Sequence, residues 1–229
     1  MNLVTQPFFE QKNLQSIDDV LLALERLGHD LPEVRLQPLD NFNQTYLIIT
    51  RNVRQQLRKG AFQHPEFLEQ FDRRFAYYYL RALQSYLRGE TESVPLAWQR
   101  AFQAAERKDV SPLVCMALGV NAHVNNDIPQ VLRDCGAGYE HYADYLRVNG
   151  IIRASLGEVI GLFKDTGSLL NPNKRLQRPA FLLGMGFLVK LWRGSAWHKF
   201  QKLRHEKTAV PRIESRAGTL SRGIEKLPI

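Results

Sequence analysis

The residues that could perform chemistry together lie in one segment, 119–129, with the sequence GVNAHVNNDIP. His123 and Asp127 are four residues apart and Asn126 is three from His123, so a continuous helix places all three on one face. An imidazole and a carboxylate at this spacing can both bind a metal ion. Because the segment follows the apolar run 113–118, its polar groups need hydrogen bonds, a metal or a ligand.

A metal or ligand site in a helical bundle takes its remaining groups from facing helices. Asp72 lies among aromatic residues in the segment FDRRF, and Thr50 ends an apolar run. For a divalent metal, we expect His123 and Asp127 as ligands and Asp72 or Asp144 to complete the set. The candidate polar site consists of Asn121, His123, Asn126, Asp127, Asp72, Asp144 and Asn149.

A purely structural interpretation of the same residues stays open. Asp127 precedes Ile128 and Pro129, so it could cap a new helix that begins there. His123 could be a buried neutral histidine bonded to a backbone carbonyl or to Asp127, and the asparagines could join helices. Gly119, one turn before His123, leaves room for a neighbouring helix or a ligand.

The elements that would position this site are helices. Helical spacing of apolar residues predicts helices near 16–28, 41–59, 64–87, 95–106 and 139–163, and a further helix from Ser111 carries the motif. No segment alternates with period two over a strand length. We therefore expect an all-α bundle of about six core helices, in which the aromatic helix 64–87 is central.

Beyond the bundle, expected at 1–165, we predict a linker at 166–178 and an apolar helix with a basic helical extension at 179–229. From Lys190 onward there are ten basic and three acidic residues, most of the net charge of +8. Such a tail is expected to contact an anionic membrane or nucleic acid, or to be simply solvated. The apolar run 181–189 is too short to span a bilayer.

Several common catalytic and cofactor-binding motifs are absent from the sequence, which argues against the corresponding enzyme classes. The sequence has no nucleophile elbow, phosphate-binding glycine loop, dinucleotide fingerprint or zinc-finger cysteine spacing. Cys115 lies in an apolar run and is expected to be a buried free thiol. Residues 1–13 lack the pattern of a secretory signal, so we expect a cytoplasmic protein, peripheral at a membrane if the tail binds one.

Several segments together resemble an uncharacterised bacterial and fungal family known only by a domain-of-unknown-function label. They are 42–50, 62–83, Trp98 with 101–102, 119–129 and 144–149, and the most specific part is Asn-Ala-His-x-Asn-x-Asp-x-Pro. The resemblance covers about 42–152. It implies a compact all-helical domain and brings no activity with it.

A weaker resemblance is to the helical zinc-dependent phospholipase C and P1 nuclease group, which also carries His-x-x-x-Asp on a helix. In that group a further histidine follows the aspartate, where this chain has Ile128 and Pro129, and an N-terminal tryptophan supplies an amine ligand. The resemblance implies that such a pair on such a helix can hold a metal.

Two functions remain open. The first is a metal- or small-ligand-binding bundle, including a metal-dependent hydrolase in which a divalent ion polarises a phosphoryl or carbonyl oxygen or activates water. The second is a non-catalytic interaction module whose polar motif fixes helix register and whose basic tail binds a membrane or nucleic acid.

Overall fold

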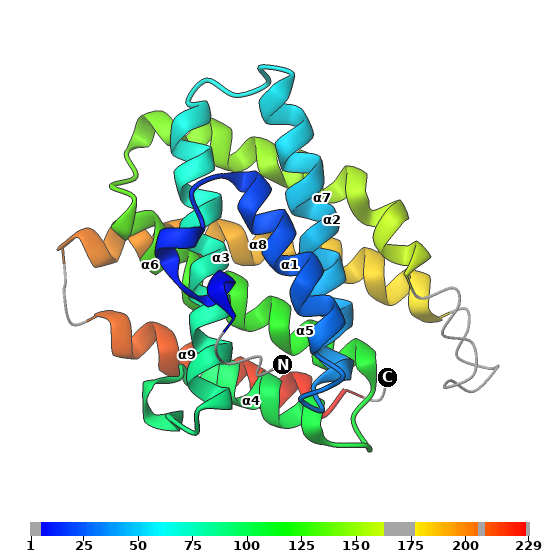
Figure 1. Ribbon diagram of the computed structural model, residues 1–229. Helices are drawn as coiled ribbons and strands as arrows, with labels where there is room; N and C mark the ends of the chain where they lie inside the picture. The colour runs from blue at the N-terminus through cyan, green and yellow to red at the C-terminus, as the bar shows by residue number, and fades with distance from the viewer. Residues whose placement is uncertain (1–5, 163–176, 206–208, 228–229) are drawn as a thin grey trace.

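The computed structural model describes residues 6–162, 177–205 and 209–227, and these residues form helices and turns without a strand (Figure 1). This confirms the expected all-α bundle. The α-helices are α1 (Ile17–Asp30), α2 (Asp40–Arg58), α3 (Pro65–Leu87), α4 (Leu96–Glu106), α5 (Pro112–Asn121), α6 (Ile128–Asp134), α7 (Tyr142–Gly161), α8 (Gln177–His205) and α9 (Ala209–Ile224).

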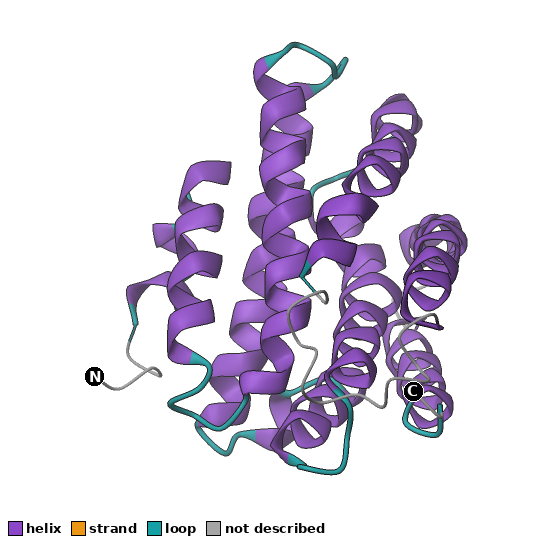
Figure 2. Cartoon of the chain, turned by 90° about the vertical axis from the view of Figure 1, so that its right-hand side faces the viewer, coloured by secondary structure: helices purple, strands orange, loops and turns teal. Residues whose placement is uncertain are grey.

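Helix α3 lies at the centre, as its wide aromatic stripe predicts. It contacts α1, α4 and α6, and Figure 2 shows the long helices of the bundle side by side. Phe71, Phe75 and Tyr79 are all buried, and so is Trp98 on α4. These large rings dominate the apolar area that folding removes from water, which is the main favourable contribution to stability.

Helix ends follow the local signals of the sequence with one exception. The Ser16 hydroxyl accepts from the Asp19 N–H, and the Asp19 carboxylate accepts from the Ser16 N–H, so α1 begins with a capping box. Gly60, which follows the C-cap residue Lys59 of α2, has a φ of 68°. The predicted stop of the first helix at Gly28 is wrong, because α1 continues to Asp30 and Gly28 instead gives α2 room to approach.

The helix that carries the motif does not break at Pro129. Residues Ala122–Asp127 form a π segment that joins α5 to α6, and Asp127 has helical angles and caps nothing with its side chain. Pro129 has no N–H, and its ring would clash with the Asn125 carbonyl of an α-helix, so a wider turn before it relieves the conflict. The side-chain Nε2 of Gln130 donates to the Asn126 carbonyl at 3.0 Å. The alternative in which Asp127 caps a new helix is therefore wrong.

The two C-terminal helices pack on the bundle. Helix α8 contacts α6, α7 and the π segment, and in Figure 1 it runs across the direction of α2 and α3. Helix α9 contacts α4, α5 and the π segment. All of the predicted linker but its last two residues lies outside the described part of the chain, and the division into domains stays a prediction. No described helix has the length and apolar character needed to cross a membrane.

Gly119 lets α2 and α5 touch. A Cβ there would lie 2.6 Å from the Phe42 ring, so we expect Gly119→Ala to destabilise the fold by about 1–3 kcal/mol through overpacking. The matched control is Gly157→Ala, at an exposed site inside α7 with nothing within 4 Å. That change should stabilise by roughly 0.5–1 kcal/mol. Urea unfolding measures both, and a neutral Gly119→Ala would contradict the close approach.

Candidate functional site

The predicted histidine–aspartate pair is formed and buried. The His123 Nδ1 lies 3.0 Å from the Asp127 Oδ2, and the two residues are 3% and 0% exposed. The same carboxylate accepts from the Trp98 Nε1 at 3.0 and 3.2 Å and from the Asn126 Nδ2 at 2.9 Å. Asp127 therefore collects three side-chain N–H groups, two from its own helix and one from α4.

Burial sets the protonation of the pair. It lowers the pKa of His123 and raises the pKa of Asp127, while their mutual hydrogen bond opposes both shifts. Three donors stabilise the carboxylate form of Asp127, and a neutral His123 must then carry its proton on Nδ1 to donate to it. The other ring nitrogen, Nε2, is left as a hydrogen-bond acceptor.

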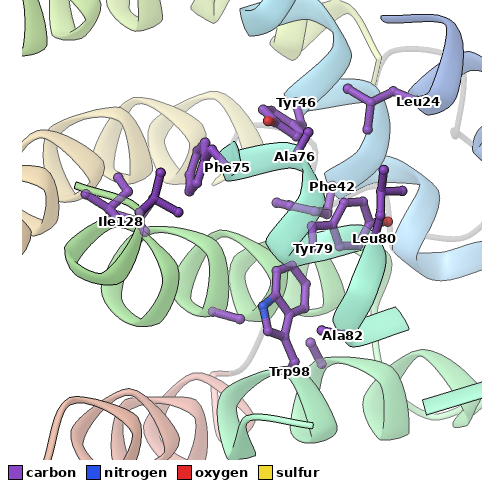
Figure 3. Close-up of a cluster of buried hydrophobic side chains, with 14 of the residues drawn as sticks. Leu24, Phe42, Tyr46, Phe75, Ala76, Tyr79, Leu80, Ala82, Trp98 and Ile128 are labelled. Carbon is purple, nitrogen blue, oxygen red and sulfur yellow. The ribbon is translucent and has the colours of Figure 1, made fainter. Parts of the chain in front are cut away.

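Aromatic rings surround the His123 imidazole. The ring of Phe75 stacks on it at 3.4 Å between centroids, and the rings of Phe42 and Tyr46 meet it edge-on at 5.7 and 4.6 Å. Tyr79 stacks on Trp98 behind them at 5.0 Å. Figure 3 shows these aromatic side chains, which come from α2, α3 and α4, gathered in one buried cluster. The cluster fixes the orientation of the imidazole.

A cavity of about 120 Å³ lies beside this imidazole, between α2, α3, α5 with the π segment, α7 and α8. Its wall is mostly apolar. Four buried polar atoms of lining residues make no hydrogen bond of standard geometry: the Tyr46 hydroxyl, the Thr50 hydroxyl, the Asp72 Oδ2 and the His123 Nε2. The Thr50 hydroxyl is still close enough to Tyr46 to oppose the rise in the Tyr46 pKa. Buried polar groups are normally paired, so these four atoms are positions at which water or a ligand can form hydrogen bonds.

Asp72 is the acidic residue of this wall. Burial raises its pKa to about 7, and the neighbouring charge of Glu69 adds to the shift. Burial, followed by the charge of Asp72, raises the pKa of Tyr46 well above its ordinary value. The Asp72 carboxyl therefore changes protonation near neutral pH, next to a phenol that stays protonated.

The other predicted site residues join helices. The Asp144 carboxylate accepts from the Gln63 and His64 N–H groups at 3.1 and 2.7 Å, just before α3. The Asn149 Oδ1 accepts from Arg193 at 2.7 Å. The Asn121 Nδ2 donates to the Ala217 carbonyl and the Ser221 hydroxyl at 2.9 and 3.0 Å and so ties α5 to α9.

The structure thus brings part of the predicted set together. His123 and Asp72 line the cavity. Asp127 forms a hydrogen bond with His123, and Asn126 donates a hydrogen bond to Asp127. Within the described part of the chain, no three His, Cys, Asp or Glu side chains gather in a group that could hold a metal ion. The described residues do not supply the third ligand that the metal hypothesis requires, and metal binding by His123 and Asp127 stays a prediction.

Sequence reasoning missed three residues of the site. Tyr46 and Trp98 looked like apolar core residues, although buried Tyr and Trp usually place their O–H or N–H against a partner. Arg193 was counted with the basic tail, but it is buried and lines the cavity. Its position between Trp192 and Trp197, in a helix with apolar spacing, was the available signal.

The geometry defines an all-helical bundle with a buried histidine–aspartate pair, whose histidine faces a small cavity between the helices. A family model described as "Family of unknown function (DUF5995)" matches residues 17–227. The chain belongs to this family, and the match extends well beyond the 42–152 of the resemblance seen in the sequence. Searches of curated proteins and of solved structures each found no match.

The raised pKa of Asp72 predicts a pH dependence of stability. Between pH 4 and 7 the unfolded chain has lost the Asp72 proton while the folded chain keeps it, so stability falls as pH rises. We expect this group to remove roughly 3–4 kcal/mol across that window. Asp72→Asn should therefore gain stability over the wild type as pH rises to 7, as measured by urea unfolding at each pH.

The control is Glu69→Gln, which removes the charge that adds to the Asp72 shift and keeps an oxygen for the Ile17 N–H. It should give a pH dependence between those of the wild type and Asp72→Asn. Parallel curves for the wild type and Asp72→Asn would show that this carboxyl titrates normally.

Proposed function

We propose that this protein binds a small molecule with an apolar body and one hydrogen-bonding end in the cavity beside His123. The observation that carries the proposal is the set of four unpaired polar atoms on one cavity wall. Each would cost about 1–3 kcal/mol if it stayed unpaired in the working protein. A ligand with a hydroxyl or similar group satisfies several of them at once.

The polar atoms specify what the ligand's polar end must offer. The His123 Nε2 accepts a hydrogen bond, so the ligand needs a donor there. The hydroxyls of Tyr46 and Thr50 donate or accept, and Asp72 donates when protonated. Apart from Arg193 and Thr45, the rest of the wall consists of apolar residues such as Val120, which favour a hydrocarbon body.

The cavity sets the ligand's size. At about 120 Å³ it is slightly smaller than the engineered cavity of about 150 Å³ that holds benzene in another protein. A ligand of about six non-hydrogen atoms therefore fits. The competing occupant is water, about four molecules by volume, and a polar, roomy site suits water as well. Binding measurements separate the two.

Two threonines of α2 give a matched test with n-pentanol as the probe. The Thr50 hydroxyl is unpaired, whereas the Thr45 hydroxyl, also on a cavity-lining residue, already donates to the Asn41 carbonyl at 2.7 Å. We expect Thr50→Val to weaken n-pentanol binding by roughly three- to tenfold, because one hydrogen bond is lost. Thr45→Val should leave the Kd within about twofold.

Saturation-transfer NMR titrations give the Kd values, and urea unfolding checks that both variants fold. The absence of n-pentanol binding to the wild type at millimolar concentration would overturn the proposal. Equal weakening by both threonine variants would place the probe away from the unpaired hydroxyl.

A second candidate function is contact with an anionic membrane surface through α8. Phe187 and Leu191, one turn apart, are 64% and 52% exposed, and Lys190 and Lys202 are exposed on the same helix. Apolar and basic side chains together are typical of helices that lie in a membrane interface. This arrangement favours a lipid surface over nucleic acid, because a nucleic-acid backbone offers no apolar region in which the two apolar side chains could be buried.

Vesicle sedimentation tests this candidate. The double change of Phe187 and Leu191 to serine should reduce binding to phosphatidylserine vesicles at low salt by about tenfold. The reason is that the variant lacks the two apolar side chains that would enter the membrane interface. Leu22→Ser, at a leucine 46% exposed on α1, is the control and should change nothing. Unchanged binding of the double variant would exclude an apolar contact at this face.

A further inference from the structure

Arg193 is a buried cation on the cavity wall. It is 4% exposed, and no other lysine or arginine of the described residues is buried. Burial lowers its pKa, but a guanidinium stays protonated in proteins, so the charge persists inside the fold. A charge in this position normally has a partner of opposite sign.

The protein supplies only neutral partners to this guanidinium. Its Nε donates to the Asn149 Oδ1 at 2.7 Å, its Nη2 donates to the Tyr145 carbonyl at 2.9 Å, and it lies 4.2 Å above the Tyr145 ring. Its Nη1 makes no hydrogen bond to any described residue, and no described carboxylate lies within ion-pair distance. The more exposed Arg74 and Arg100, by contrast, pair with acidic residues.

Asp72 on the same wall does not neutralise Arg193. A nearby positive charge would lower the pKa of a carboxyl group. The pKa of Asp72 is instead raised, by burial and by the charge of Glu69. Asp72 is therefore largely neutral below about pH 7, and the cavity wall carries a net positive charge.

We propose that the cavity's ligand is a small monocarboxylate whose carboxylate group contacts Arg193. This inference rests on the proposed small-molecule function and names its chemical class. The free Nη1 can donate to a carboxylate oxygen, and such charge-assisted bonds are about twice as strong as neutral ones. The hydrocarbon part then lies among the apolar side chains of α2, α3 and α7, and a hydroxyl at the other end of the ligand meets the unpaired polar atoms beside His123.

A monoanion fits this wall better than a phosphate. One guanidinium with one free nitrogen balances a single charge, whereas a phosphate dianion would bring a second charge and three acceptor oxygens. No other lysine or arginine lines the cavity within the described residues. The volume of about 120 Å³ also limits the ligand to a short chain or a single ring.

The decisive experiment compares pentanoate with pentanamide, which match in shape and differ in charge, on the wild-type protein at pH 6. We expect pentanoate to bind about tenfold tighter by saturation-transfer NMR or calorimetry, corresponding to about 1.4 kcal/mol. If pentanamide binds and pentanoate binds no better, the carboxylate inference is wrong while the small-molecule proposal stands. If neither binds, and n-pentanol does not bind either, the proposed function itself fails.

Variants then assign the preference to Arg193. Arg193→Met removes the charge and should abolish the preference for pentanoate over pentanamide. Asn149→Ala removes one hydrogen bond of Arg193 but keeps its charge, so it controls for a loosened contact between α7 and α8. It should retain the preference, and so should Arg193→Lys, in weaker form. Equal preference in Arg193→Met and the wild type would overturn the assignment.

Discussion

The structure depends on one buried carboxylate. Asp127 is fully buried and accepts from Trp98, His123 and Asn126. A carboxylate without those donors would be too costly to bury, so the indole of α4, the imidazole and the amide must all be in place around it. The tautomer of His123, the stacking of Trp98 on Tyr79 and the approach of α4 to the π segment all follow from this requirement.

The same carboxylate separates two environments. On one side lie saturated hydrogen bonds and stacked aromatic rings, which leave little freedom for rearrangement. On the other side lies the cavity, where polar atoms from α2, α3 and the π segment stay without partners. His123 belongs to both, because its Nδ1 is fixed by Asp127 while its Nε2 remains available. Carboxylates orient histidines in the same way in catalytic and metal sites.

Sequence patterns predicted the helices because apolar periodicity and capping residues are local. They also placed His123 and Asp127 on one face and assigned close packing to Gly119, which the Phe42 ring confirms. They did not separate the residues that line the cavity from those that join helices. Asp144 and Asp72 look alike in sequence. The Asp144 carboxylate accepts from the backbone N–H groups just before α3, whereas the Asp72 Oδ2 has no hydrogen-bond partner. That difference arises only from how the helices pack. The sequence patterns also left open whether the helix continues through Pro129 or restarts there, because sequence rules do not anticipate that a helix can widen and continue.

The π segment has a consequence for the register of the motif helix. A π turn closes its hydrogen bonds one residue later than an α turn, so it accommodates what amounts to a single-residue insertion without interrupting the helix. Every side chain after it is rotated by about 100° relative to an unbroken α-helix. The faces that α6 turns toward α3 and α8 are therefore set by the extra residue, and the polar segment acts as a spacer that aligns the two halves of one long helix with different neighbours.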